Sequence, residues 1–94
     1  MVGINLNSFK KQFDQLKTAF DTLPEAALQE FKANTPVKTG NARRNTRLYG
    51  NVITADYVYA QRLDEGYSKQ SPDGMTAPTE EWLHKEVERR LKGI

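Results

Sequence analysis

The chain has 94 residues, a formal net charge of +2 and no cysteine. A chain of this length forms one domain, so we expect residues 1–94 to fold as a single unit. The composition excludes a disulfide scaffold and a cysteine-ligated zinc site. No segment reaches the roughly 18 apolar residues of a membrane span, and no apolar signal core follows Met1. We therefore expect synthesis in the cytosol and no membrane contact.

The first third of the chain has the apolar spacing of an amphipathic helix. Asn7 or Ser8 would cap its N-terminus. Pro24 then begins a second helical segment, which Asn34 and Pro36 end. The pattern leaves open whether Pro24 kinks one long helix or separates two. The apolar positions of the first segment recur at alternating spacings of three and four residues and are Leu6, Phe9, Phe13, Leu16, Phe20 and Leu23.

A turn and two strands are expected next. Thr35–Gly40 reads as a connector in which Pro36 fixes its own φ and Gly40 supplies a positive φ. Arg44–Tyr49 and Val52–Tyr57 have strand-like composition. The two residues between these segments predict a tight antiparallel hairpin.

The hairpin turn is the pair Gly50-Asn51. In the second strand Val52 and Thr54 would point to one face, and Ile53 and Ala55 to the other. An isolated hairpin is marginally stable in water. We therefore expect the N-terminal helical stripe to cover its apolar face.

The last third of the chain predicts a short helix, a loop and a long helix. Val58–Leu63 would be helical and end before Gly66, and Tyr67–Met75 would be a polar, mobile loop. Pro78 or Thr79 would begin the C-terminal helix, whose apolar stripe is Leu83, Val87 and Leu91 with Trp82 at its edge. The overall prediction is an α+β fold: N-terminal helix, central antiparallel hairpin or small sheet, short helix, mobile loop and C-terminal helix.

Charge is distributed unevenly along the chain. From Pro36 to Ala55 there are four cations, Lys38, Arg43, Arg44 and Arg47, and no acid. From Asp56 to Gly74 the net charge is −2. Adjacent blocks of opposite sign suit contact between copies of the same protein. The alternative interpretation is two solvated faces of opposite sign.

No catalytic pattern is present in the sequence. His84 is the only histidine, and Asp64 and Glu65 are adjacent, so in a helix they point in different directions. No glycine-rich phosphate loop or metal-binding spacing occurs. We expect no enzyme activity, no cofactor and no metal. The alternative function is nucleic-acid binding, in which Arg43, Arg44 and Arg47 contact phosphates and Tyr49 stacks on a base.

Two motifs in this order resemble a known family. T-P-V-K-T-G at Thr35–Gly40 is followed by a basic segment and a hairpin, and then by Y-V-Y-A-Q-R-L-D-E-G at Tyr57–Gly66. This arrangement, covering roughly Ala26–Leu91, resembles the tail-completion (neck) proteins of long-tailed bacteriophages. The chain departs from the family where Ala42 replaces a frequent leucine and where Tyr67 follows Gly66.

The resemblance implies a structural virion protein that joins the tail to the head connector. Such proteins form a ring at the top of the tail, hexameric in the virion, with the genome in its lumen. The implied partners are other copies of the chain, the tail tube protein and the head connector protein, with non-specific contact to genomic DNA. The implied location is the neck of the virion, after synthesis in the host cytoplasm.

The residues expected to matter fall into two groups. The residues expected to form the backbone turns are Pro36, Gly40, Gly50 and Gly66. The expected subunit and partner contacts are Lys38, Arg43, Arg44, Arg47, Tyr57, Tyr59, Asp64, Glu65, Tyr67 and Lys69.

Overall fold

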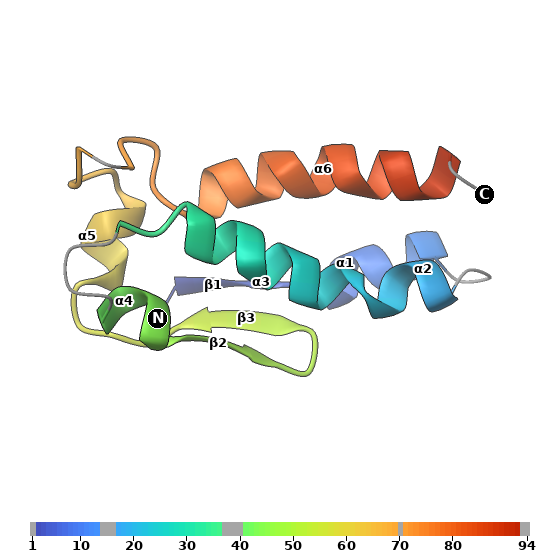
Figure 1. Cartoon of the computed structure of the whole chain (residues 1–94), viewed down its shortest axis with the longest axis horizontal. Coiled ribbons are helices and arrows are strands. Elements are labelled where there is room, and N and C mark those ends of the chain that lie inside the picture. Colours follow the sequence, from blue (N-terminus) through green and yellow to red (C-terminus); the bar gives the residue numbers. More distant parts are fainter. Residues whose placement is uncertain (1, 14–16, 37–40, 70, 93–94) are drawn as a thin grey trace.

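The fold is α+β, with N-terminal helices, a three-stranded antiparallel sheet, a short helix and a long C-terminal helix, as predicted (Figure 1). The computed structural model describes residues 2–13, 17–36, 41–69 and 71–92. The predicted turn residue Gly40 and the predicted contact residue Lys38 lie outside these ranges.

The sheet contains a strand that precedes the first expected helix. β1 (Val2–Asn5) pairs with β3 (Val52–Ala55), which also pairs with β2 (Thr46–Tyr49), so the strand order is β1-β3-β2. In β1, Val2 and Ile4 are buried while Gly3 and Asn5 are exposed. Two apolar residues at a spacing of two are too short a signal to distinguish a strand, which is why β1 was not predicted.

The β2–β3 hairpin agrees with the prediction in its turn and in the faces of β3. Gly50 has φ 61°, the left-handed conformation that a two-residue hairpin turn needs. Ile53 and Ala55 are buried, whereas Val52 and Thr54 are half-buried on the other face.

Both hairpin strands are shorter than predicted. β2 begins at Thr46 because Arg44 belongs to a helical turn, α4 (Asn41–Arg44). The Thr46 hydroxyl donates to the carbonyl of Ala42 at 2.8 Å, which closes α4 onto the start of the strand. The expectation that Arg44 lies in the strand is therefore wrong.

The first helical segment is divided into short pieces. They are α1 (Asn7–Lys10), the 3-10 turn η1 (Lys11–Phe13) and α2 (Lys17–Asp21). Neither Asn7 nor Ser8 caps α1; instead the Asn5 Oδ1 accepts a hydrogen bond from the Asn7 N–H at 2.9 Å. The apolar stripe is nevertheless confirmed in the described residues, since Leu6, Phe9, Phe13, Phe20 and Leu23 are all buried, while Leu16 lies outside them.

Pro24 separates helices rather than kinking one. It lies in the first turn of α3 (Leu23–Ala33). Backbone N–H groups in a first turn have no acceptor within the helix, so the N–H that proline lacks costs no hydrogen bond there. Ala27, Leu28 and Phe31 are buried along one side of α3, and Asn34 is its C-cap, as predicted. α3 packs on the sheet through β2 and β3 and contacts α6 on its other side.

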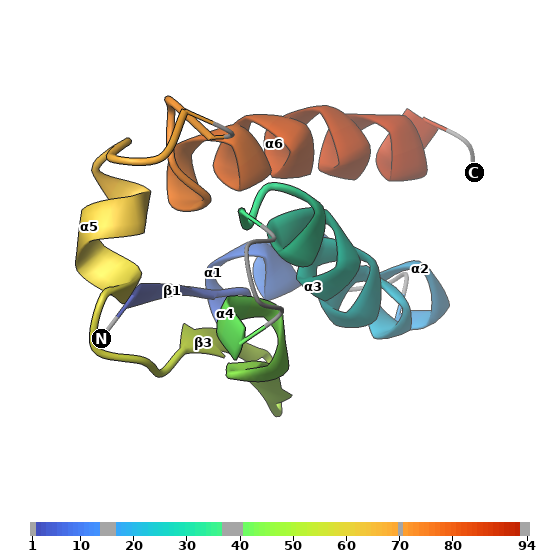
Figure 2. The same ribbon diagram turned by 60° about the vertical axis from the view of Figure 1, so that its left-hand side comes forward.

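The C-terminal helix completes the layered core. α5 (Ala60–Asp64) and a loop lead into α6 (Thr76–Lys92), which begins two residues earlier than expected, so that Pro78 falls in its first turn. Leu83 and Val87 are buried, with Leu91 and Trp82 packed at the edge of the core. Figures 1 and 2 show α3 and α6 on the same side of the sheet, with α3 packed on β2 and β3, and α5 at one end of the molecule.

Close packing of β1 on β3 leaves no room for a side chain at Gly3. An added Cβ would lie 2.0 Å from the carbonyl oxygen of Ile53. Gly3→Ala should therefore lower the free energy of unfolding by about 1–3 kcal/mol, because the strands must separate to relieve the clash. Urea denaturation measures this change.

The matched control is Gly50→Asn. No atom lies within 4 Å of a Cβ added at Gly50, and asparagine tolerates its φ of 61°. This variant should lose less than about 1 kcal/mol. Equal losses in the two variants would contradict the assigned contact between β1 and β3.

Candidate interaction surfaces

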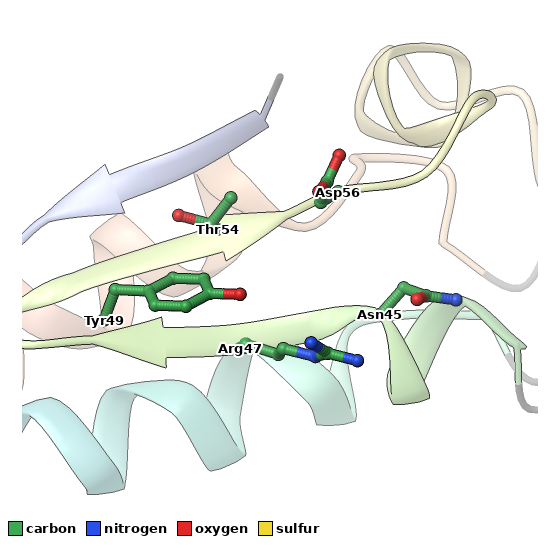
Figure 3. A pocket seen from close by; sticks show the side chains of 5 residues that line it. All are labelled: Asn45, Arg47, Tyr49, Thr54 and Asp56. Carbon is green, nitrogen blue, oxygen red and sulfur yellow. The ribbon is translucent and has the colours of Figure 1, made fainter.

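The outer face of the hairpin is a polar surface beside an aromatic ring. Arg47 and Tyr49 lie on β2 and Asn45 directly before it, while Thr54 lies on β3 and Asp56 directly after it. Together these five residues line a small pocket (Figure 3). Alternate residues of a strand share a face, which places these side chains on the side opposite the helices. We call this group the sheet surface and consider with it Arg44, the exposed residue that precedes Asn45 at the end of α4.

The cations at the sheet surface form no ion pair with another described residue. Arg44 and Arg47 are exposed and form no ion pair within the described part of the chain. Tyr49 is 58% exposed, so its ring is open to a partner. Arg43 also lies in α4, but its side chain is outside what the structure describes.

The two charge blocks of the sequence are not fully separated in space. Asp56, the first acid of the negative block, lines the same pocket as Arg47. Its backbone N–H donates to the carbonyl of Asn45 at 3.0 Å, which extends the hairpin by one pair and brings the acid beside the cations. The sheet surface is therefore positive with one acid at its edge.

A second surface surrounds α5. Val58 is fully exposed, and Tyr59 and Tyr67 are 39% and 72% exposed. The guanidinium of Arg62 lies 5.9 Å from the centre of the Tyr67 ring, a cation–π contact that keeps the arginine on this surface. We call Val58, Tyr59, Arg62, Glu65 and Tyr67 the α5 surface. It lies at the same end of the molecule as α4 (Figure 1).

Tyr57 is more deeply placed than a contact residue would be. Its ring centre lies 4.8 Å from that of Tyr59, and its hydroxyl is buried without a hydrogen-bond partner among the described residues. Burial, followed by the nearby Tyr59 and Asp64 charges, raises the pKa of Tyr57 to about 12. Tyr57 therefore stays neutral at physiological pH and supports the Tyr59 ring from beneath.

Asp64 has a structural task inside the chain. Its Oδ1 accepts hydrogen bonds from the backbone N–H groups of Met75 and Thr76, at 3.1 and 2.7 Å. These donors stand at the N-terminus of α6, where a carboxylate also complements the helix dipole. Glu65, the neighbouring acid, is exposed and accepts only from the Gln61 side-chain amide at 3.3 Å in the described residues. Asp64 thus holds the fold, and Glu65 is available to a partner.

Gly66 permits the tight return from α5 toward α6. It has φ 91°, and an added Cβ would lie 2.2 Å from the carbonyl oxygen of Pro72. Met75 is fully buried at the far end of this loop, while Lys69 within it is exposed. The mobility expected of Tyr67–Met75 stays a prediction, although both ends of this segment are packed against α5.

The two motif-bearing segments meet. The Ser71 hydroxyl, five residues after Gly66, donates a hydrogen bond to the carbonyl of Asn34, directly before Thr35. Thr35 is buried and its hydroxyl donates to the carbonyl of Phe31 at 2.8 Å, while Pro36 is half-buried. The start of the first motif is therefore connected to the loop that follows the second.

Groups for chemistry are sparse in the part of the chain that the structure describes. Its residues contain no cluster of three or more His, Cys, Asp or Glu side chains placed to hold a metal ion. None of its helices has the length and apolarity needed to cross a membrane. His84 is exposed and packs edge-on against Phe9, with ring centres 5.8 Å apart.

Sequence reasoning named several residues of both surfaces, and their role in contacts stays a prediction. Tyr49, Tyr59, Tyr67, Arg44 and Arg47 are exposed, as contact residues must be. Val58 carried no signal, because one apolar residue beside a helix looks like a core position. Comparison of the chain with protein-family models, with curated proteins and with solved structures found no match.

Removing the Asp64 carboxylate should destabilise the fold. Asp64→Ala leaves the two N–H groups at the start of α6 without their acceptor, so the free energy of unfolding should fall by about 0.5–2 kcal/mol. Glu65→Ala, which removes an exposed acid next in sequence, should change it by less than about 0.5 kcal/mol. Thermal or urea unfolding of both variants measures the difference, and a larger loss for Glu65→Ala would contradict the capping role.

Proposed function

We propose that this chain is a structural virion protein that completes a bacteriophage tail and joins it to the head connector. The observation that carries the proposal is where its apolar surface lies. The four large apolar side chains exposed in the described residues, Tyr49, Val58, Tyr59 and Tyr67, all belong to the sheet surface or the α5 surface. Exposed aromatic residues beside arginine are typical of the centres of protein interfaces.

The sequence resemblance supports the same proposal. Its two motifs lie in segments that contact each other through Ser71 and Asn34. The residues between the two motifs build the sheet surface, and the second motif itself, with the following Tyr67, builds the α5 surface. A family-like motif pair that contributes to two exposed surfaces favours an assembly part over a protein that acts by chemistry.

The proposed mode of action is ring formation followed by docking. Copies of the chain would contact one another around the tail axis, as a hexamer in the virion. One rim of the ring would bind the tail tube protein and the other the head connector protein, with genomic DNA passing through the lumen. Folding and assembly, rather than covalent chemistry, would be the whole of its activity.

Disrupting the gene in the phage or prophage that encodes the chain tests this role. We expect DNA-filled heads and complete tails that do not join, because the part between them is missing. Electron microscopy of the lysate distinguishes separate from joined particles. Supplying the unaltered chain from a plasmid should restore joining. Joined, infectious particles formed in the absence of the chain would refute the proposal.

A second candidate function is non-specific nucleic-acid binding by the sheet surface. It is favoured by Arg44 and Arg47, which lack an ion pair among the described residues, and by the open ring of Tyr49. Arginine contacts to phosphate combined with base stacking on an aromatic ring are typical of sites that bind single strands. Asp56 at the edge of this surface opposes such binding.

Salt-dependent retention of single-stranded DNA tests the second candidate. Arg44→Ala with Arg47→Ala should weaken retention and reduce the slope of log affinity against log salt by about 1 for each arginine. The matched control removes two cations already paired on α6, Lys85 and Lys92. Equal retention by the arginine variant, the control and the parent would reject this function.

A further inference from the structure

We propose that the sheet surface of one copy binds the α5 surface of a second copy, head to tail. The choice of a second copy as the partner rests on the proposed assembly role. The contact itself is argued from exposure, charge and position, and it names which two surfaces meet.

The first argument is that each of the two surfaces exposes apolar side chains that the other could cover. The sheet surface offers a single exposed ring, Tyr49, flanked by polar side chains. The α5 surface offers the exposed Val58 with Tyr59 and Tyr67. A tyrosine ring set against exposed apolar side chains buries area on both partners at low cost in side-chain entropy.

Charge complementarity is the second argument. Arg47 lies on the sheet surface and the exposed Arg44 precedes it at the end of α4, while Glu65 belongs to the α5 surface and Asp73 is exposed in the loop that follows. Asp73 lies next to α5 because the neighbouring Gly74 packs against the backbone of Asp64. In the described residues neither these two arginines nor these two acids form an ion pair.

The remaining charges on the two surfaces also fit. Asp56 at the edge of the sheet surface would meet Arg62 of the α5 surface, whose guanidinium lies over Tyr67. By contrast, the cations of α6 between Lys85 and Lys92 are paired within the helix, in the pairs Lys85–Glu81, Arg89–Glu86, Arg90–Glu86 and Lys92–Glu88. Charge that is not satisfied within the fold is thus present on both proposed partners.

Contact between two different surfaces has a distinctive consequence. Each copy that binds through its sheet surface leaves its α5 surface free, and the reverse. The oligomer therefore grows by one copy at a time, and it closes into a ring if the rotation between neighbouring copies permits. A two-fold dimer through one shared patch cannot grow in this way.

Two variants, each defective in one surface, test this arrangement. The sheet variant is Arg47→Glu with Tyr49→Ala, and the α5 variant is Val58→Asp with Tyr67→Ala. All four side chains are exposed, so circular dichroism and thermal unfolding should match the parent. The control is Lys11→Glu, which reverses an exposed cation away from both surfaces.

The measurement is the change in amide NMR signals when one variant is isotope-labelled and the other is added unlabelled. Concentrations up to about 1 mM detect dissociation constants of that order. The labelled sheet variant should shift only around α5, and the labelled α5 variant only along β2 and β3. The mixture should reach the mass of a dimer and no larger, while each variant alone stays a monomer, and added salt should weaken binding.

The contrary outcomes are distinct. No binding in the mixture, or self-association of either variant alone, would overturn the head-to-tail contact. Weaker self-association of the Lys11→Glu control than of the parent protein would overturn the assignment of the contact to these two surfaces. Shifts of the β2 and β3 signals with single-stranded DNA, and none with the second variant, would assign the sheet surface to nucleic acid. Separate heads and tails after gene disruption, together with no binding here, would leave the neck role standing and reject only this contact.

Discussion

The capping of α6 by Asp64 is the interaction on which the arrangement of the C-terminal half depends. One carboxylate oxygen accepts hydrogen bonds from the N–H groups of Met75 and Thr76, so the start of α6 is attached to the end of α5. Gly66 and Gly74 allow this closeness, since a side chain at either would strike a carbonyl oxygen. The acidic L-D-E-G segment therefore joins α5 to the start of α6 through Asp64. Only its exposed residue, Glu65, is accessible to a partner.

α6 is also held at its other end. The Arg90 guanidinium donates to the carbonyl of Ala19 and to the hydroxyl of Thr22, at 2.8 and 2.7 Å, and its Nε contacts Glu86 at 3.0 Å. An acid at the N-terminus and a base near the C-terminus both complement the helix dipole. Between these two attachments Leu83 and Val87 pack into the core. Because a small domain buries little apolar surface, the polar attachments at both ends add to what holds α6 in place.

Elements with a long or repeated signal were predictable from the sequence. α3 and α6 follow a helical apolar period, and the hairpin has its glycine at the required turn. β1 and α4 are four residues each, too short to show a period. Of the expected contact residues, Tyr59, Tyr67, Arg44 and Arg47 are exposed, whereas Tyr57 is half-buried. The role of Asp64 was not predicted, because its acceptor geometry joins residues that are eleven and twelve positions apart.

The molecule is elongated, and its two ends carry different elements. The molecule extends over 40 Å in its longest direction and only 22 and 18 Å in the others. α5 and α4 lie at one end, whereas α6 runs toward the opposite end (Figure 1). An affinity tag or a surface linker attached after α6 therefore projects away from both exposed surfaces. Immobilised in this orientation, the chain presents those surfaces to the solution, and one attached through α5 would conceal them.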